Sequence, residues 1–353
     1  MDAAAPHQQH PGLPEPALAE YLQAHVDGFR GPLRARKFAG GQSNPTYRID
    51  AASGSYVLRR QPAGALLHSA HAVDREFRVL QALHGGAVPV AAPLHLCTDT
   101  GLLGSMFYLM EFVDGPVYRD PALPDLDPAQ RGACYDAMLR VLVAIHAVDV
   151  DTVGLTGFGR AGDYFARQLA RWSAQYRASE TATVAAMDAL IEQLPRACPA
   201  DDGQMALVHG DFRIDNLIFA PLATASPAQG AVQAVVDWEL STLGHPLADL
   251  GYLCMALRLP RNPVLPGLQG LDRGALGIPD EGRMLARYEQ LSGRDVHSNW
   301  DFVLAFSFFR LAAIAQGVAW RAQQGNASSS QAAQAGAMTP ILAAAGLAAL
   351  ERR

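Results

Sequence analysis

The first third of the chain alternates short apolar runs with turn residues. Strand-like segments occupy residues 33–38, 46–49 and 55–59, and they are separated by the glycine pair 40–41 and by residues 51–54. Glycine and small polar residues between alternating apolar positions favour tight hairpins. The pattern therefore predicts three consecutive antiparallel strands near the start of the chain.

A helix and two further strands follow these three segments. Residues 70–84 have apolar side chains at helical spacing and end at the glycine pair 85–86, which is typical of a helix C-terminus. The shared apolar face consists of Val73, Phe77, Leu80 and Leu83. Strands are predicted at residues 93–97 and 106–112. The expected order is strand, strand, strand, helix, strand, strand.

Long amphipathic helices dominate the rest of the chain. They are predicted at residues 129–146, 163–176, 182–194, 281–291, 302–320 and 340–351, with short apolar runs at 206–208, 217–219 and 232–236 around a polar loop. A sheet-rich part followed by a helical part indicates an α+β fold. We expect a disordered arm (1–16), a small first lobe (17–113) that begins with a helix near residues 16–29, and a larger helical second lobe (114–353).

Composition and charge exclude several classes of protein. A formal net charge of −6 argues against a dedicated nucleic-acid binder, which usually has a basic excess. The four cysteines form no CxxC pair, so we expect reduced thiols and no zinc site. The N-terminal residues lack the apolar stretch of a signal peptide, and the later apolar runs are short or interrupted, as Arg310 interrupts residues 302–320. A cytoplasmic protein with no membrane partner is expected.

The most informative sequences are His-Gly-Asp-Phe-Arg-Ile-Asp-Asn at residues 209–216 and Val-Val-Asp-Trp-Glu at residues 235–239. Both lie at the ends of short apolar runs, so their polar side chains are expected on one loop surface. Phosphoryl transfer requires a carboxylate beside the attacking hydroxyl, oxygen ligands for Mg²⁺ and cations near the phosphates. The residue types in these two segments suit that chemistry.

These two segments resemble the sequences of a known family. The pattern H-x-D-x-x-x-x-N, followed by an aspartate after an apolar pair, resembles the catalytic and metal-binding loops of protein kinases. The sequences HGDFRIDNLIF and VVDWE are similar to those of the aminoglycoside-phosphotransferase and choline-kinase-like family, in particular to the kinase-like domains associated with acyl-CoA dehydrogenases. The segments GGQSNPTY, YVLRRQP, AVDREFRVL and FYLMEFVDG agree with this, in the same order. The resemblance implies a two-lobed, protein-kinase-like fold and an ATP- and Mg²⁺-dependent small-molecule kinase.

The resemblance also implies catalytic and metal-binding roles in the second lobe. Asp211 would be the base that orients the substrate hydroxyl and accepts its proton. Asn216 and Asp237 would hold the Mg²⁺ ion. Arg213 lies where protein kinases have a lysine that contacts the transferring phosphoryl group.

Other residues of this region are interpreted as supports. His209 is expected to brace the loop and not to carry a proton, and Asp249 matches the family's aspartate that supports the catalytic loop from below. Asp215 is interpreted as structural. Glu239 and His245 have two possible roles, and the sequence does not decide between them: they could support the metal ligands from behind, or they could cap a loop.

In the first lobe, the resemblance implies a phosphate-binding loop and an ion pair. Gly41, Ser43 and Asn44 would let backbone N–H groups approach the phosphates closely. Arg59 lies where kinases have the strand lysine that contacts the α- and β-phosphates, and Glu76 would be its partner. The arginine is a departure, because its guanidinium is a rigid fork and not a flexible point charge. Weaker catalysis and an altered nucleotide preference both stay open.

The adenine site is implied by four positions. The Glu111 carbonyl and the Val113 N–H would face the adenine edge, in the segment that joins the lobes. Val57 from the first lobe and Ile218 from the second would enclose the ring. The sequence does not decide between ATP and GTP.

The acceptor is expected to be a small molecule with a hydroxyl group. Only eleven residues separate Asp237 from Asp249, which leaves no room for the activation and peptide-docking segments of a protein kinase. Arg258, Arg261 and Arg273 could border the acceptor site and favour an anionic acceptor such as a hydroxyacyl-CoA or hydroxy acid, or they could merely solvate the surface.

Two alternatives to this function stay open, together with the oligomeric state. The first is a catalytically silent nucleotide-binding or scaffold protein of the same fold, and the second is an aminoglycoside kinase. The apolar C-terminal helices suit internal packing and a homodimer interface equally well.

Overall fold

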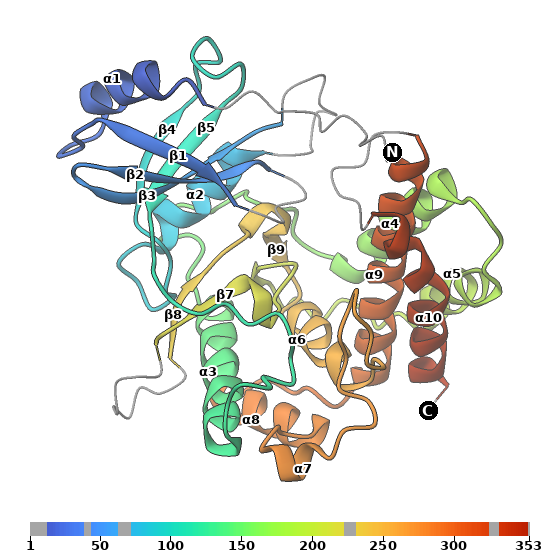
Figure 1. The fold of residues 1–353 in the computed structure, drawn as a ribbon. Coiled ribbons are helices and arrows are strands. Elements are labelled where there is room, and N and C mark those ends of the chain that lie inside the picture. The colour runs from blue at the N-terminus through green and yellow to red at the C-terminus, as the bar shows by residue number, and fades with distance from the viewer. Residues whose placement is uncertain (1–12, 39–43, 63–71, 222–230, 325–331, 352–353) are drawn as a thin grey trace, which may run out of the picture. The chain divides into compact units, whose positions relative to one another are not determined.

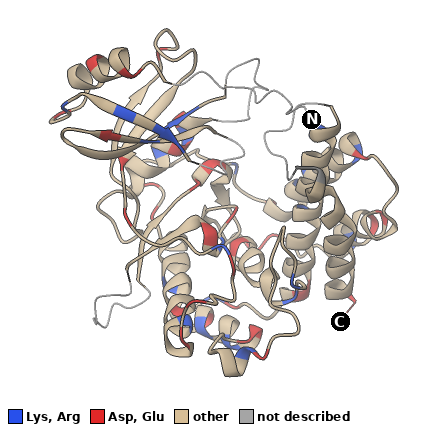
Figure 2. Ribbon diagram, in the orientation of Figure 1, with Lys and Arg blue, Asp and Glu red and all other residues tan. Residues whose placement is uncertain are grey.

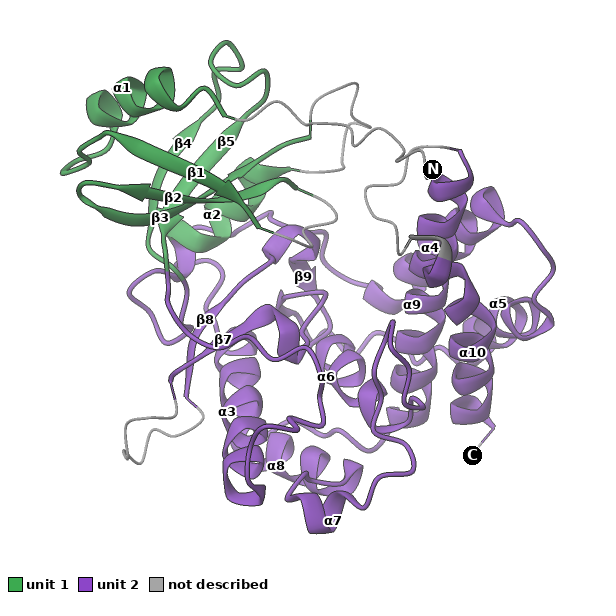
Figure 3. Cartoon of the chain, in the orientation of Figure 1, with its two compact units in different colours: residues 1–81, 91–112 green, residues 82–90, 113–353 purple. Residues whose placement is uncertain are grey.

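The structure, a computed structural model, describes residues 13–38, 44–62, 72–221, 231–324 and 332–351. The chain forms two units: residues 1–81 with 91–112 make up unit 1, and residues 82–90 with 113–353 make up unit 2 (Figure 3). Unit 1 ends at Phe112, one residue before the boundary expected at residue 113. Residues 82–90 belong to unit 2, although they precede that boundary.

Unit 1 contains one antiparallel sheet with the strand order β1-β2-β3-β5-β4 (Figure 1). Its elements are α1 (Glu15–His25), β1 (Leu33–Lys37), β2 (Thr46–Ala51), β3 (Gly54–Arg60), α2 (Val73–Leu83), β4 (Pro93–Cys97) and β5 (Phe107–Glu111). The predicted order of strands and helix is confirmed. The chain turns within two residues between β2 and β3, where Gly54 has a φ of +144° that favours glycine.

Two helices contact opposite faces of this sheet. Successive side chains of a strand point to opposite sides, so Phe107 and Leu109 lie in one core with Leu18 and Leu22 of α1. Tyr108, between them, faces α2, where its ring centroid lies 5.8 Å from that of Phe77. Strand β5 is thus buried on both sides over residues 107–109, and it places an aromatic hydroxyl on the α2 side.

Unit 2 is mainly helical, with two small two-stranded sheets. Its helices are α3 (Pro128–His146), α4 (Tyr164–Ser179), α5 (Ala185–Ala197), α6 (Leu247–Cys254), α7 (Arg273–Leu276), α8 (Glu281–Ser292), α9 (Trp300–Gln323) and α10 (Ala332–Leu350). The strands are β6 (Ala206–Val208), β7 (Leu217–Phe219), β8 (Val232–Val235) and β9 (Thr242–Gly244), paired as β6–β9 and β7–β8. Short 3-10 helices lie at Ile214–Asn216, Trp238–Leu240 and Met255–Leu257. The α+β class is confirmed.

Helix α9 is the central core helix of unit 2. It is long and apolar enough to cross a membrane, but 83% of its most apolar stretch is buried within the protein. It packs against α4, α5, α6 and α10. Burial on all sides explains why its sequence is apolar around its whole circumference.

The starts of α1, α5 and α10 differ from the sequence expectation, and α4 and α9 each end three residues later than expected. Helix α1 begins at Glu15 and Leu13 is buried, so the last residues assigned to the arm belong to the folded unit, while residues 1–12 lie outside the described residues. Helix α5 begins three residues later than expected, at Ala185. Helix α10 begins at Ala332 and contains Pro340 in its interior. The predicted start at Pro340 was wrong, because proline is common at a helix start and was interpreted as one.

Candidate active site

The catalytic loop, residues 209–216, leaves β6 through a sharp turn at Gly210. This residue has a φ of +82°, and a Cβ atom there would lie 2.4 Å from the Leu240 carbonyl oxygen. Both the backbone angle and the close approach require glycine. The loop ends in the 3-10 helix Ile214–Asn216 and continues directly into β7. The turn therefore directs Asp211 away from the end of β6.

Asp249 of α6 supports this loop from the protein interior. Its carboxylate is fully buried and accepts hydrogen bonds from the backbone N–H groups of His209 (2.6 Å) and Gly210 (2.8 Å). Burial opposes ionisation, but hydrogen bonds from His146 and the backbone outweigh it and lower the pKa of Asp249. The interpretation of Asp249 as the support of the loop is confirmed.

His146 completes the buried network beneath the loop. Its Nδ1 lies 2.7 Å from the Tyr288 hydroxyl, and its Nε2 lies 3.4 Å from Asp249. Burial lowers the pKa of this imidazole, so it is neutral. A neutral ring that accepts from Tyr288 and donates to Asp249 satisfies both contacts.

His209 braces the loop through both ring nitrogens. Its Nε2 donates to the Val236 carbonyl at 2.9 Å, and its Nδ1 accepts the Asp211 backbone N–H at 3.2 Å. The ring is completely buried and lies 4.7 Å from the Trp238 ring, centroid to centroid. The expected bracing role is confirmed, and Trp238 is a packing residue.

Asn216 is hydrogen-bonded to the expected base. Its side-chain Nδ2 donates to the Asp211 carbonyl (2.8 Å) and to the Asp211 carboxylate (3.1 Å). The backbone carbonyl of Asn216 accepts the Val236 N–H at 3.0 Å, which connects the catalytic loop to the segment before Asp237. The amide of Asn216 therefore orients the carboxylate of Asp211, and its Oδ1 is the atom left for a cation.

Asp237 follows β8 in a left-handed backbone conformation, with φ 66° and ψ 56°. Such a conformation is uncommon for residues other than glycine and is found preferentially at functional sites. Asp237 also contributes to the electrostatic environment of Arg213, as Asp211 does. The oxygens of Asn216 and Asp237 are ligands of the kind that Mg²⁺ prefers, so the residues present fit the expected ion.

Arg213 is held among carboxylates. Its Nη2 donates to Asp215 at 2.9 Å, and its Nε lies 3.3 Å from the Asp211 carboxylate. Burial by itself would lower the pKa of the guanidinium, but Asp211 and Asp215 raise it. Burial raises the pKa of Asp215, and Arg213 opposes that shift. Asp215 thus acts on Arg213, in line with the structural role expected for it.

In unit 1, the expected ion pair between Arg59 and Glu76 is confirmed. The Arg59 Nε lies 3.0 Å from the Glu76 carboxylate, which is almost completely buried. Glu76 also accepts hydrogen bonds from the Tyr108 hydroxyl (3.0 Å) and from the Asn44 side-chain amide (2.9 Å). The Asn44 side chain is therefore engaged with Glu76, while the phosphate contact of its backbone N–H stays a prediction. Gly41 and Ser43 lie outside the described residues.

The four residues expected around adenine belong to both units. Val57 is buried in β3, and Glu111 ends β5 with its N–H bonded to the Ala92 carbonyl at 2.9 Å. Val113 and the half-buried Ile218 belong to unit 2. Their shared role in adenine binding stays a prediction.

The arginines expected to border an acceptor site make internal contacts instead. Arg258 forms two hydrogen bonds with Glu281 (2.8 and 2.6 Å), and Arg261 forms two with Asp120 (2.7 and 2.6 Å). Arg273 donates to the Leu257 carbonyl at 2.8 Å. Basic and acidic positions are likewise interspersed within each unit (Figure 2). The arginines therefore neither merely solvate the surface nor provide an argument for an anionic acceptor.

His245 caps a loop. Its Nδ1 accepts the Leu247 N–H at 3.3 Å and its Nε2 lies 3.4 Å from Asp202, while burial lowers its pKa. Of the two interpretations left open for it, loop capping fits these contacts.

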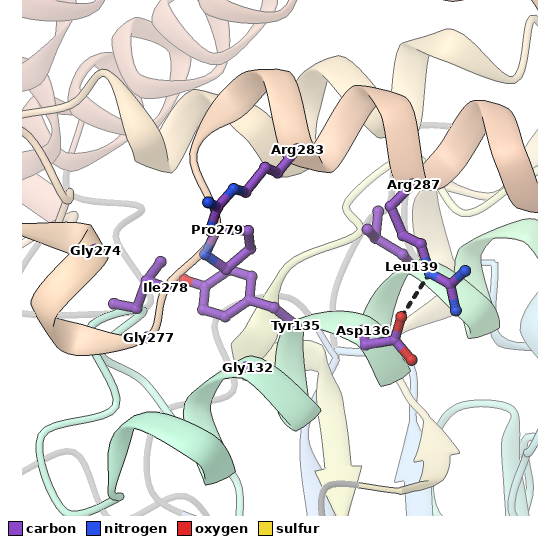
Figure 4. A pocket seen from close by; sticks show the side chains of 10 residues that line it. All are labelled: Gly132, Tyr135, Asp136, Leu139, Gly274, Gly277, Ile278, Pro279, Arg283 and Arg287. Atoms are coloured by element: carbon purple, nitrogen blue, oxygen red, sulfur yellow. Dashed lines mark hydrogen bonds and ion pairs between the residues drawn. The ribbon is translucent and has the colours of Figure 1, made fainter.

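A cavity of about 240 Å³ lies between α3, α7 and α8 and contains no residue of the catalytic loop. Figure 4 shows that Tyr135 and Ile278 line one part and that Arg287 contacts Asp136 at its edge, at 2.7 Å. The Tyr135 hydroxyl already donates to the Pro121 carbonyl at 2.7 Å. Tyr135 and Arg287 are thus already hydrogen-bonded within the protein.

Sequence reasoning missed two residues beside the loop, Tyr252 of α6 and Arg310 of α9. Burial raises the pKa of the Tyr252 phenol and Asp211 raises it further, so the phenol is protonated next to the expected base. Arg310 donates to the Gly210 carbonyl at 2.5 Å. An arginine within an otherwise apolar helix was the available signal, because arginine is rarely buried without a partner.

Comparison with known proteins identifies the family of this chain. Residues 34–286 match the model of the phosphotransferase enzyme family. The chain is 46% identical over 333 residues to mouse acyl-CoA dehydrogenase family member 10, covering 94% of this chain but only 30% of that protein. A candidate aminoglycoside phosphotransferase from Ralstonia eutropha is 44% identical, with a TM-score of 0.84 and coverage of 96% and 98% of the two chains.

A more distant structure shows the same fold. Spectinomycin phosphotransferase, solved with ADP and spectinomycin, is 14% identical, with a TM-score of 0.62 over 94% of this chain and 97% of that one. The expected kinase-like fold is confirmed. The family match covers well over half of the chain and includes the catalytic loop, Asp237 and the Arg59–Glu76 pair. This chain therefore belongs to the phosphotransferase enzyme family.

Proposed function

We propose that the chain is a kinase that transfers the γ-phosphoryl group of ATP to a hydroxyl group of a small metabolite. The observation that carries the proposal is the arrangement around Asp211, whose carboxylate is oriented by the Asn216 amide on a loop held by Asp249 and His209. Membership of a phosphotransferase family supports the reaction class. The ADP bound to spectinomycin phosphotransferase supports an adenine nucleotide as donor.

The reaction follows from the properties of these side chains. The Asp211 carboxylate accepts a hydrogen bond from the acceptor hydroxyl and takes its proton as the oxygen attacks the γ-phosphorus. The bond from the γ-phosphorus to the β,γ-bridging oxygen breaks, and ADP leaves. Asn216 and Asp237 would hold Mg²⁺, which supplies positive charge to the phosphate oxygens when bound. Arg213 provides a fixed cation beside the base. Most of the catalysis comes from positioning and charge, because phosphoryl transfer requires little covalent chemistry from the protein.

A hydroxyacyl-CoA or a hydroxy acid is the acceptor class that we favour. The support is the 46% identity to a protein named as an acyl-CoA dehydrogenase family member, of which this chain spans 30%. An aminoglycoside is the second candidate, because the Ralstonia eutropha protein carries that designation at 44% identity. The internal pairing of Arg258 and Arg261 means that surface charge favours neither class.

The test is Mg²⁺-dependent ADP release from ATP, measured with hydroxyacyl-CoAs, hydroxy acids, choline-like alcohols and aminoglycosides. We expect one class to stimulate turnover in the wild type. Asp211→Asn should lower turnover by at least about 100-fold, since general bases contribute roughly 10²- to 10⁴-fold, while nucleotide binding is retained. Asp188→Asn, in an exposed ion pair with Arg177, serves as the control.

Unchanged turnover in Asp211→Asn would refute its role as the base. Nucleotide binding without turnover for any acceptor would favour the catalytically silent scaffold, for which Arg59 in place of lysine is the motivating feature. Replacing ATP by GTP in the same assay tests the proposed nucleotide preference.

A further inference from the structure

A buried arginine lies in the middle of the core helix of unit 2. Arg310 is only 4% exposed, and its neighbours in sequence, Phe309 and Leu311, are apolar. Burial of a cation is unfavourable unless specific contacts compensate for the lost hydration. Among the residues that the structure describes, no carboxylate forms an ion pair with Arg310. The lost hydration of its guanidinium must therefore be compensated by other contacts.

Within the described part of the chain, Arg310 contacts one backbone carbonyl and two aromatic rings, and its Nε has no hydrogen-bond partner. Its Nη2 donates to the Gly210 carbonyl at 2.5 Å. The guanidinium carbon lies 5.5 Å from the ring centroid of Trp172 in α4 and 5.3 Å from that of Tyr252 in α6. Aromatic faces attract cations, most strongly where water is excluded. The guanidinium thus lies over two rings, and its Nη2 donates to the catalytic loop.

The carbonyl that Arg310 contacts belongs to the peptide unit that joins Gly210 to Asp211. The N–H of the same peptide unit donates to the Nδ1 atom of His209 at 3.2 Å. A peptide unit is planar, so these two bonds fix its orientation at both ends. The preceding N–H, that of Gly210, is held by Asp249 at 2.8 Å. The backbone before the Asp211 side chain is therefore held by α9, by α6 and by the ring of His209 in the loop itself.

The ring of Tyr252 provides a second connection between Arg310 and the loop. One face of this ring contacts the guanidinium, and its phenol interacts with the Asp211 carboxylate. Displacement of Arg310 would therefore disturb both the backbone before Asp211 and a group beside its carboxylate.

We propose that Arg310 is a positioning residue that fixes the Gly210–Asp211 peptide and thereby the direction of the Asp211 carboxylate. The positioning role of Arg310 rests on the proposed function of Asp211, whereas its restraint on the loop does not. Arg310 itself touches no reacting atom. Its effect should therefore fall on the rate of the chemical step and not on nucleotide affinity.

The test uses Arg310→Met, which keeps an unbranched side chain without the charge, and Arg310→Lys, which restores a cationic donor. Gln316→Leu is the matched control, because Gln316 is another buried polar residue of α9 whose amide donates to the Ser179 carbonyl (2.7 Å) and not to the loop. Two readouts are needed: hydrogen exchange of the backbone amides of residues 209–212, and the separate values of kcat and KM with the acceptor found for the wild type.

For Arg310→Met we expect faster exchange of these loop amides and a roughly 10- to 100-fold lower kcat, as for small misplacements of a catalytic group, with the KM for ATP unchanged. Arg310→Lys should recover part of both effects. Gln316→Leu should leave loop exchange and kcat as in the wild type.

Wild-type exchange of residues 209–212 in Arg310→Met would overturn the proposal, whether or not a phosphotransfer has been found. Equal losses of kcat in Arg310→Met and Gln316→Leu would also overturn it, because they would show a general packing role. Faster loop exchange in Arg310→Met, in a protein whose wild type transfers no phosphate to any acceptor, would instead refute the proposed function and support the restraint.

Discussion

At the scale of single residues, the catalytic loop depends on a buried carboxylate whose hydrogen bonds are satisfied. This is the carboxylate of Asp249, and a fully buried carboxylate is stable only with several donors around it. Its donors are two consecutive backbone N–H groups of the catalytic loop and the neutral ring of His146. The same carboxylate therefore contributes to folding and holds the loop in shape.

Asp249→Asn should destabilise the protein in a pH-dependent way. Hydrogen bonds to a charged group contribute about 1.5–3 kcal/mol each, so a loss of about 3 kcal/mol or more is expected at pH 7. The folded pKa of Asp249 is lowered, so its stabilisation is present above the unfolded value of about 4 and is lost as the pH falls through the folded pKa.

Urea unfolding between pH 7 and pH 3 measures this difference. The gap in unfolding free energy between the wild type and Asp249→Asn should narrow as the pH falls below about 4. A gap that is constant over the whole range would show that folding does not shift the pKa of Asp249.

At the scale of elements, one carboxylate joins three parts of unit 1. Glu76 projects from α2 and contacts Arg59 of β3, Tyr108 of β5 and Asn44, which precedes β2. β3 and β5 are neighbours, and Arg59 is paired directly with Tyr108 in their register. The pair that the resemblance implied for phosphate binding is thus also the contact that attaches α2 to the sheet.

Glu76→Gln should therefore weaken unit 1 itself. Removal of one partner from a buried ion pair costs about 3–5 kcal/mol, because the other charge is left buried. Tyr108→Phe removes one neutral donor and should cost about 1 kcal/mol. The midpoint of urea unfolding, followed by circular dichroism, measures both.

Glu20→Gln is the matched control in the same unit, because Glu20 is exposed on α1 and a surface substitution usually changes the free energy of unfolding by no more than about 0.5 kcal/mol. Equal effects of Glu76→Gln and Glu20→Gln would contradict the role assigned to Glu76.

At the scale of the whole molecule, the cysteines report on packing in both units. Cys97, Cys134 and Cys254 are buried and Cys198 is partly exposed, and all four are free thiols. Burial raises the pKa of Cys134 to about 11 and raises that of Cys254 as well. Such thiols are protonated at neutral pH and unreactive.

A thiol reagent at pH 8 should therefore modify at most Cys198 in the folded protein and all four cysteines in denaturant. The number of groups modified, read by mass spectrometry, distinguishes these results. Rapid modification of Cys254 without denaturant would show that the core of unit 2 is more open than the structure indicates.

Regular local patterns made much of the fold predictable from the sequence. Alternating strands of unit 1 and the helical spacing of the apolar residues in α2 and α3 led to nearly correct bounds, because each signal lies within a few neighbouring residues. Helix α10 was placed too late, since Pro340 looks locally like a helix start. Within the catalytic loop, His209 and Asn216 could be assigned because a short motif holds them close in sequence to Asp211.

The sequence by itself determined the class of the fold, the order of its elements and the family-specific loop, because each depends on local periodicity or on a short run of residues. Only the tertiary structure decided which distant groups meet. Arg258 and Arg261 looked available for an anionic acceptor, yet the fold pairs them with carboxylates distant in the chain. Arg310 looked like an interruption of an apolar helix, yet it lies against Gly210, 100 residues earlier. Such partners follow from how helices pack, and a pattern of neighbouring residues carries no information about that packing.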